Sequence, residues 1–300
     1  MYSLRRIKRG LRNPQLILRE LNRIYYTRKG RRDHNVGGDD VFEEDWDNLI
    51  ILDACRYELF ENIDLEGELE SRVSKGASTI EFLRGNFRNK KLNDTVYVTA
   101  NPHFSGMNED LNSEIHSLVN VWGGEGWSNI FDTVMPETVR EEALEAYNEF
   151  PDKRLVVHFM QPHYPFVSRD EKIEVPTDIE HIWNKVMAGE VEVDPETAWS
   201  SYRKTFEFVM REVENLVEDL DGKTVVTADH GNVYNERVSP IPVKEWGHPI
   251  GIYDRKLVKV PWLVIDGERR EIKSSEKENK ETAVENDEDI KEKLSKLGYK

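Results

Sequence analysis

The chain has 300 residues, 38% of them hydrophobic and 33% charged, with a net charge of −16 at pH 7. This size suits one large domain or two small ones, and the negative charge excludes general nucleic-acid binding because a polyanion would be repelled. No apolar run approaches the roughly 20 residues of a membrane span, and the N-terminus lacks the apolar core of a signal peptide. A single cysteine excludes an intramolecular disulfide and fits a reducing compartment. Together these features predict a cytoplasmic protein.

The first 32 residues are basic, unlike the rest. They hold eleven Arg and Lys side chains against one Glu, a charge of +10, which leaves −26 for the other residues because the whole chain carries −16. Apolar residues recur here at roughly helical spacing, and Pro14 interrupts or restarts the helix. Such a helix can lie on an anionic membrane, here the inner membrane face, or fold back on the acidic body, and the sequence leaves both open. Residues 33–40 are expected to be the linker into the domain.

A buried strand that ends in an acid follows the linker. Four apolar residues, Leu49 to Leu52, lead directly into Asp53, a pattern typical of a central parallel strand. The carboxyl edge of such a sheet is where open α/β proteins place their chemistry. A lone carboxylate is costly to desolvate, so Asp53 either caps the next helix or holds a metal.

A glycine turn with two hydroxyls comes next, after a predicted short helix at 57–63 and a strand or connector at 69–73. Ser78 and Thr79 follow Gly76 and precede an apolar helix that carries Glu81. One interpretation is a helix cap assisted by the glutamate. The other is functional, because a helix N-terminus suits an oxyanion or phosphate, and a hydroxyl there beside a metal is an activated nucleophile. The local sequence alone favours the cap.

The middle of the chain alternates predicted strands and helices. Residues 95–100 read as a buried strand that ends at Asn101, residues 104–130 as a long surface excursion with four glycines, and residues 136–150 as a helix that begins near a proline. Another strand is predicted at 155–160.

Two prolines, at positions 162 and 165, frame a histidine after that strand. They keep the loop extended, so His163 is expected to project, whereas mid-strand His158 reads as a core histidine. Residues 199–220 then form a long helix with one apolar face.

A second acid-tipped strand lies at 223–229. It ends in Asp229, which is followed by His230 and by Gly231, whose missing Cβ allows a sharp turn. Carboxylate oxygen beside imidazole nitrogen suits zinc, manganese or iron better than calcium. A polar segment then leads to His248, and the predicted elements end with a strand at 258–265, a charged and flexible stretch at 268–286, and a small amphipathic helix at 287–297.

These motifs occur in an order that resembles one family. They are the strand ending at Asp53, the hydroxyl pair at a helix start, and then, in sequence, Pro162-His163-Tyr164-Pro165, Thr227-Ala228-Asp229-His230-Gly231, Gly247-His248-Pro249 and Leu294-Ser295-Lys296-Leu297-Gly298-Tyr299. The chain resembles a sulfatase-like member of the alkaline phosphatase superfamily over about residues 46–299. The resemblance implies a three-layer α/β/α fold with a mostly parallel sheet, in which 41–267 form the catalytic domain, 268–300 are a tail that belongs to it, and 1–40 lie outside. It also implies a metal-assisted hydroxyl or formylglycine nucleophile that attacks a phosphate or sulfate ester.

Departures from the family pattern narrow this expectation. The formylglycine motif Cys/Ser-x-Pro-x-Arg is absent around Cys55, and the second Asp-x-x-x-His ligand set of two-zinc relatives is not found before His163. The chain is therefore similar to single-metal lipid and glycan phosphotransferases, whose nucleophile is a threonine. By this resemblance Thr79 is the nucleophile, with Ser78 as the alternative, and one divalent ion (Zn, Mn, Mg or Ca) is held by Asp53, Thr79, Asp229 and His230.

The remaining roles follow from charge. His163 or His248 donates to an oxygen or protonates the leaving group, Asn101 and Asn232 contact substrate, and Arg56 either binds the anion or forms an ordinary ion pair. The predicted substrate is an anionic ester, with glycan-linked or lipid-linked phosphate preferred. Sulfate-ester hydrolysis is the runner-up, and a non-catalytic sulfatase-like binding protein is the rival from another class.

Overall fold

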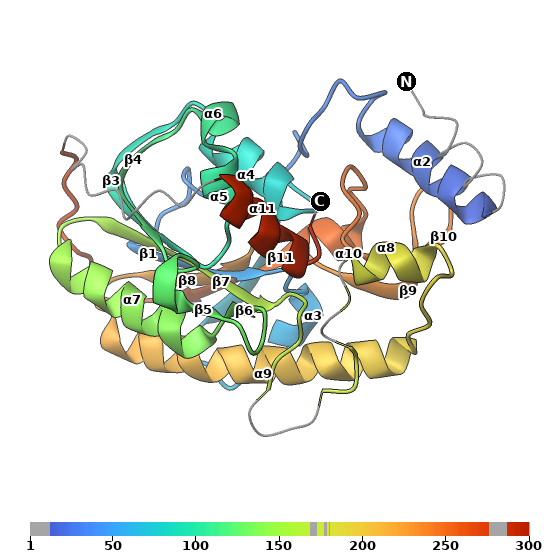
Figure 1. The fold of residues 1–300 in the computed structure, drawn as a ribbon. Helices are drawn as coiled ribbons and strands as arrows, with labels where there is room; N and C mark the ends of the chain where they lie inside the picture. Colours follow the sequence, from blue (N-terminus) through green and yellow to red (C-terminus); the bar gives the residue numbers. More distant parts are fainter. Residues whose placement is uncertain (1–12, 169–172, 177–178, 180, 276–286, 300) are drawn as a thin grey trace.

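A seven-stranded sheet forms the centre of the molecule (Figure 1). The structure, a computed structural model, describes residues 13–168, 173–176, 179, 181–275 and 287–299. The strand order is β2-β11-β8-β1-β7-β3-β4, and β11 alone runs against the other six. These strands are β1 (Asn48–Asp53), β2 (Glu68–Val73), β3 (Lys91–Thr99), β4 (Glu114–Asn120), β7 (Arg154–Pro162), β8 (Thr224–Ala228) and β11 (Lys259–Ile265).

Helices cover both faces of this sheet. One face packs against α7 (Pro136–Glu149) and α9 (Pro195–Asp219), and the other against α4 (Thr79–Phe87), α5 (His103–Gly106) and α6 (Asn108–Leu111). Figure 1 shows α7 and α9 on one side of the sheet and α4 to α6 on the other. The predicted three-layer α/β/α fold with a mostly parallel sheet is therefore confirmed.

The β1 strand shows why its apolar run forms the middle of the sheet. Successive side chains on a strand point to opposite faces. Leu49 and Ile51 accordingly join the core cluster beneath α4, while Ile50 and Leu52 join the cluster beneath α9, and all four are fully buried. With both faces covered, the strand needs apolar residues between its ends, so Leu49 to Leu52 are apolar and the polar residues Asn48 and Asp53 stand at its two ends.

Two predicted surface segments contain strands. The segment 104–130 was expected to be an excursion, but β4 within it pairs in parallel with β3 at the sheet edge. Polar residues at positions 114, 116, 117 and 120 interrupt its apolar ones, as an edge strand allows, and this weakens the strand pattern. Further on, β9 (Val233–Val238) and β10 (Val243–Gly247) form a hairpin, and β5 (Trp127–Ser128) pairs with β6 (Thr133–Val134).

The N-terminal helix α2 (Pro14–Tyr26) packs on the body of the protein. Buried Asn22 exchanges two hydrogen bonds with the backbone of Ile241, and Arg19 pairs with buried Glu245 of β10. The fold-back alternative is thus confirmed for α2, whereas residues 1–12 of the basic segment lie outside the described residues. No helix in the described ranges is long and apolar enough to span a membrane.

The other helices are short. They are α3 (Tyr57–Phe60), α8 (Ile182–Met187), α10 (Arg255–Val258), α11 (Asp287–Lys296) and the 3-10 turn at Gly124–Gly126. The last of the α-helices, α11, was predicted from the sequence, and it packs against α5. Most of the charged stretch expected to be flexible, residues 276–286, lies outside the described residues.

Candidate metal centre and active site

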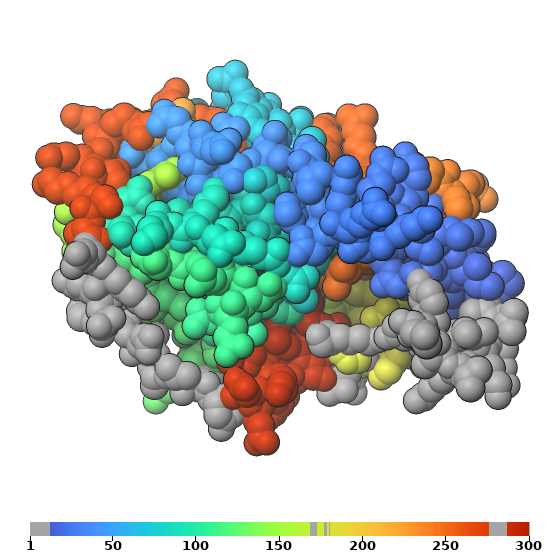
Figure 2. Space-filling model, turned by 90° about the horizontal axis from the view of Figure 1, so that it is seen from above, coloured from blue at the N-terminus to red at the C-terminus, as the bar shows by residue number. Residues whose placement is uncertain are grey.

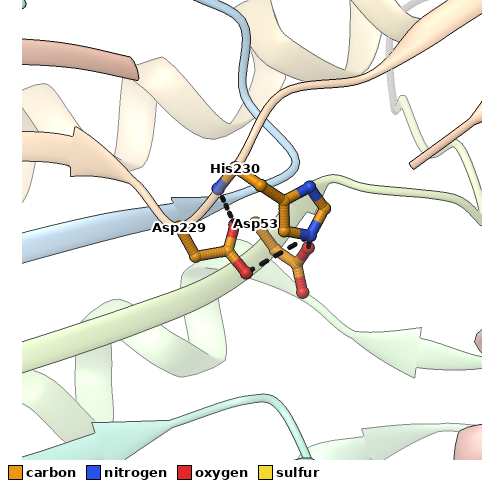
Figure 3. Close-up of side chains that lie close together, drawn as sticks. All are labelled: Asp53, Asp229 and His230. Atoms are coloured by element: carbon orange, nitrogen blue, oxygen red, sulfur yellow. Dashed lines mark hydrogen bonds and ion pairs between the residues drawn. The ribbon is translucent and has the colours of Figure 1, made fainter. Parts of the chain in front are cut away.

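The two acid-tipped strands lie side by side. Leu52 of β1 is paired in parallel with Ala228 of β8, so the residues that follow each strand meet at the same edge of the sheet. This register brings together Asp53, Asp229 and His230 (Figure 3). Among the described residues, these three are the one group of His, Cys, Asp and Glu side chains placed to share a metal ion.

Three lone-pair-bearing atoms face one another in this group. The His230 ring donates from Nδ1 to the Gly231 carbonyl at 2.8 Å, so its Nε2 carries a lone pair. That Nε2 lies 3.5 Å from Asp53 Oδ1 and 3.4 Å from Asp229 Oδ2 (Figure 3). Neither of these carboxylate oxygens has a hydrogen-bond partner, and both residues are fully buried.

A bound cation would satisfy these two unpartnered carboxylate oxygens. Buried acceptors without donors are costly, and the charge of Asp229, added to burial, holds the pKa of Asp53 well above its ordinary value. Two carboxylates and an imidazole are also the donor set that divalent ions accept. The residues therefore fit a divalent metal ion, and the structure does not determine which one.

The remaining oxygens of the two aspartates are held by neutral donors. Asp229 Oδ1 accepts the backbone N–H groups of His230 at 2.8 Å and Ala54 at 2.9 Å. Ala54 reaches this position with φ at 59°, a left-handed conformation that is costly for alanine. Asp53 Oδ2 accepts from Asn101 at 2.8 Å and from the Tyr299 hydroxyl at 2.9 Å. The carboxylates are thereby fixed with their free oxygens toward His230.

Thr79 lies at the first position of α4, against the same group. Its Oγ1 is 3.4 Å from Asp53 Oδ2 and 3.5 Å from His230 Nε2, and the residue is fully buried. A side chain at Gly76 could not fit, because a Cβ there would come within 2.4 Å of the Phe82 nitrogen. The predicted glycine turn therefore delivers the threonine hydroxyl to the metal group.

Ser78 occupies the N-cap position, but its hydroxyl does not cap the helix. The side chain makes no capping bond and instead lies 3.4 Å from Glu81 Oε2. Glu81 is buried and accepts from Ala77 N–H on one oxygen and from Gly251 N–H and the Tyr253 hydroxyl on the other. The predicted hydroxyl cap is wrong, and Glu81 ties the helix start to the loop after His248.

The two loop histidines, predicted separately, contact each other. His163 Nε2 lies 2.9 Å from His248 Nε2. Because His163 donates from Nδ1 to the Tyr164 carbonyl, its Nε2 accepts and His248 Nε2 carries the proton. Burial lowers the pKa of His163 to about 3, and that of His248 also falls well below its ordinary value, so both rings are neutral at pH 7.

Three residues predicted to bind substrate make other contacts. Asn101 donates to Asp53, while Asn232 is buried and bonds to Tyr234 and to the Val233 backbone. The Arg56 guanidinium pairs with Glu58 and Glu236 and lies over the Trp199 ring. The ion-pair alternative therefore describes Arg56 in the structure, and its contact with a substrate anion stays a prediction. His158 is a core histidine bonded to Tyr97, with Nε2 3.9 Å from Asp229 Oδ2.

A cavity of about 310 Å³ opens beside the centre. Ser78, His163, His248 and Tyr299 form its inner end. The outer wall comes from segments far apart in the sequence and includes Arg19, Glu20, Arg23, Trp183 and Trp246. This wall was not predicted from the sequence, because α2 has the pattern of an independent basic helix and α8 is only six residues long.

No family profile matches the sequence, and no curated protein matches it. Solved structures do resemble the fold at low identity. One is the C-terminal periplasmic domain of EcEptC from Escherichia coli in complex with Zn: identity 12%, TM-score 0.43, covering 77% of this chain and 76% of that one. Another is the soluble domain of lipooligosaccharide phosphoethanolamine transferase A from Neisseria meningitidis. Its sequence identity is 12% and its TM-score is 0.48, and the match covers 73% of this chain and 75% of that one. A third is a protein in the alkaline phosphatase superfamily from Vibrio parahaemolyticus. Its sequence identity is 13% and its TM-score is 0.37, and the match covers 84% of this chain and 66% of that one.

These comparisons agree with the resemblance predicted from the motifs and correct one expectation. The predicted cytoplasmic location is contradicted, because structures similar to this one are described as periplasmic domains. Since identities and TM-scores are low, what the chain does has to be argued from the geometry of its own site.

Proposed function

We propose that the protein is a metal-dependent enzyme that cleaves or transfers phosphate esters through a covalent intermediate on Thr79. One observation carries the proposal: a threonine hydroxyl at a helix N-terminus lies within 3.5 Å of two members of a buried Asp, Asp, His group whose facing lone pairs lack donors. A divalent ion bound there would lower the pKa of a nearby hydroxyl and neutralise the charge of an anionic ester.

Other residues of the chain supply the attacking group, the stabilisation of charge and the contact with the leaving group. Thr79 Oγ1 attacks phosphorus, and the N–H groups at the start of α4 face the oxygens of the transferred group. As the bond from Oγ1 to phosphorus forms, the bond from phosphorus to the leaving oxygen breaks, and that oxygen takes the proton released by the Thr79 hydroxyl. The neutral His248 ring, whose Nε2 carries a proton, stabilises the leaving oxygen by a hydrogen bond as its charge develops. The adduct on Thr79 then passes to water or to an acceptor hydroxyl.

Phosphate is preferred over sulfate because the nucleophile is an unmodified threonine. Cys55, the single cysteine, is fully buried, and its thiol contacts the Arg56 carbonyl instead of the metal group. Sulfate-ester hydrolysis remains the second candidate. A non-catalytic binding protein would need neither an unpartnered donor set nor a hydroxyl aligned with it, so that rival has less support.

We also propose that α2 places the cavity against an anionic membrane surface, with a glycan-linked or lipid-linked phosphate as substrate. Of the eight large hydrophobic side chains exposed in the described ranges, four belong to this helix: Ile17, Leu18, Leu21 and Tyr25. The same helix lines the cavity with Arg19 and Arg23. Residues 41–267 together with α11 are proposed to be the catalytic domain.

Sedimentation with vesicles tests the membrane contact. We expect the full chain to sediment with vesicles that contain anionic lipid and not with neutral ones. Replacing Ile17, Leu18 and Leu21 by serine, which keeps every charge, should abolish sedimentation. If the triple variant sediments like the wild type, α2 is only a packed wall of the cavity.

Trapping the adduct tests the catalytic proposal. The metal-loaded protein would be given aryl phosphate monoester, diester and sulfate substrates, and its intact mass would be measured after rapid quenching. The expected result is one phosphoryl adduct in the wild type and in Ser78→Ala, and none in Thr79→Ala, because an attacking group has no substitute. An adduct on Ser78, or normal turnover by Thr79→Ala, would contradict the assignment.

A further inference from the structure

The proposed nucleophile is closed off from the cavity. Thr79 and the three metal-group residues are fully buried, and none of them lines the cavity. Tyr299 lies between the two regions, because it lines the inner end of the cavity and also contacts Thr79 and Asp53. An ester in the cavity can therefore reach Thr79 only after Tyr299 moves.

Tyr299 occupies the place next to the nucleophile. Its hydroxyl donates to Asp53 Oδ2 at 2.9 Å and lies 3.3 Å from Thr79 Oγ1. Its ring is stacked on His163, with centroids 4.8 Å apart, and meets His103 edge-on at 4.3 Å. Reacting atoms must approach within about 3–3.5 Å before attack. The ester and the tyrosine hydroxyl therefore compete for one position.

The backbone of the segment that carries this tyrosine has few contacts outside its own helix, whereas the side chains of Leu297 and Tyr299 are buried in the core. Gly298, with φ at 85°, ends α11 as a helix cap, and Tyr299 N–H bonds back to Leu294. Outside its own helix, the backbone of this turn is held by His181, whose Nδ1 donates to the Gly298 carbonyl at 3.0 Å. The α11 helix itself lies at the molecular surface (red in Figure 2). Opening the segment therefore breaks one backbone contact outside α11 and exposes the side chain of Tyr299.

We propose that residues 297–299 are a gate over the catalytic centre, which opens when Tyr299 leaves Thr79 and Asp53 and an ester oxygen takes the place of its hydroxyl. The inference deepens the proposed function and rests on it for the identity of the nucleophile. It makes Tyr299 the residue that controls which esters reach Thr79 and how fast a bound ion escapes.

Zinc release tests the gate without any substrate. Protein loaded with Zn²⁺ would be mixed with excess chelator, and release would be followed over time. Removal of the tyrosine side chain in Tyr299→Ala should speed release about tenfold or more, because local opening no longer limits escape. Tyr299→Phe keeps the ring and loses both hydroxyl contacts, so its release rate should lie between those of the wild type and Tyr299→Ala. The matched control Tyr147→Ala, on α7, should release zinc at the wild-type rate.

The same variants separate a gate from a catalytic group. With aryl phosphates of increasing size, Tyr299→Ala should raise the ratio of kcat/KM for the bulkiest ester to kcat/KM for the smallest, because the side chain no longer limits entry. Release at the wild-type rate from both Tyr299 variants would overturn the gate, and so would an unchanged ratio. Tyr299→Phe preserves the packing and gives the answer if Tyr299→Ala does not fold. A wild type that binds zinc but turns over no ester would refute the proposed function, while the release rates would still decide the gate.

Discussion

The metal group and the cavity wall are built in opposite ways. The metal group rests on two neighbouring parallel strands in the middle of the sheet, β1 and β8, and each strand contributes its acid directly at its end. The cavity wall is assembled from α2, α8, β10 and the turn after α11, which come from four separate parts of the chain. The proposed chemistry is thus placed at the centre of the sheet, and the proposed gate lies in a peripheral segment.

The largest effect should come from the metal group. Asp229→Asn removes a charge that faces a second carboxylate, so we expect metal affinity to fall by more than about a hundredfold, beyond what loss of a ligand's supporting partner costs. Turnover should fall with it. In excess chelator, however, the variant should be no less stable than the wild type, because the repulsion with Asp53 is relieved. Thermal unfolding with metal should show the variant to be less stable than the wild type, and thermal unfolding in excess chelator should show it to be at least as stable.

The next effect is smaller and concerns folding stability, which should fall when the contact between Arg19 and the cavity wall is removed. Arg19 pairs with Glu245, whose side chain is 0% exposed, so Arg19→Ala leaves a buried carboxylate without its partner. This should cost about 3 kcal/mol of unfolding free energy and raise KM more than it lowers kcat. The control is Arg203→Ala, whose pair with Glu207 is more than half exposed and should contribute under about 0.5 kcal/mol. Equal effects of the two variants would show that the wall is not anchored by Arg19.

The buried histidines behind the gate should make stability depend on pH. Burial lowers the pKa of His103 to about 3, below its ordinary value near 6.5. Between these values the unfolded chain binds a proton that the folded chain does not, so stability is lost as pH falls below about 6.5. His103→Gln should reduce the loss between pH 7.5 and pH 5 by up to about 2 kcal/mol. Denaturant unfolding of the wild type and the variant at both pH values measures this loss of stability. A loss of the same size in the two proteins would contradict the prediction.

The smallest effect is expected at the helix start. A hydroxyl cap is worth about 1 kcal/mol, but the Ser78 side chain makes no capping bond. Ser78→Ala should therefore change the unfolding free energy by less than about 0.5 kcal/mol, within the usual range for replacements that remove no strong contact. A loss of 1 kcal/mol or more would restore the cap. Glu81→Gln is the informative comparison, because that carboxylate accepts four donors and its loss should cost more.

The contrast between the two regions also explains what the sequence could predict. Asp53 and Asp229 each end an apolar run, and parallel strands place such ends at one edge, so their convergence follows from local pattern and topology. The assignment of Thr79 came from the family resemblance, because the glycine turn before the helix alone favoured a cap. The signals at the two aspartates are short-range and need no knowledge of which distant segments pack together.

The wall and the gate depend on long-range packing that leaves no local pattern. Nothing around Arg19 indicates that it pairs with Glu245, and nothing around Tyr299 indicates that its hydroxyl reaches Asp53. The pair between Arg56 and Glu236 was equally hidden, since the two residues are 180 positions apart. The edge strand β4 was missed because half-exposed strands carry polar residues.

The most direct test of the central claim is the amount of divalent metal bound at equilibrium. Zinc and manganese would be titrated into the metal-free wild type, Asp53→Asn, Asp229→Asn and Thr79→Ala, and the bound metal counted per chain. The account predicts one ion per chain in the wild type, retained in Thr79→Ala and strongly weakened in both aspartate variants. Two ions bound with similar affinity at independent sites, or an Asp229→Asn protein that binds like the wild type, would contradict it.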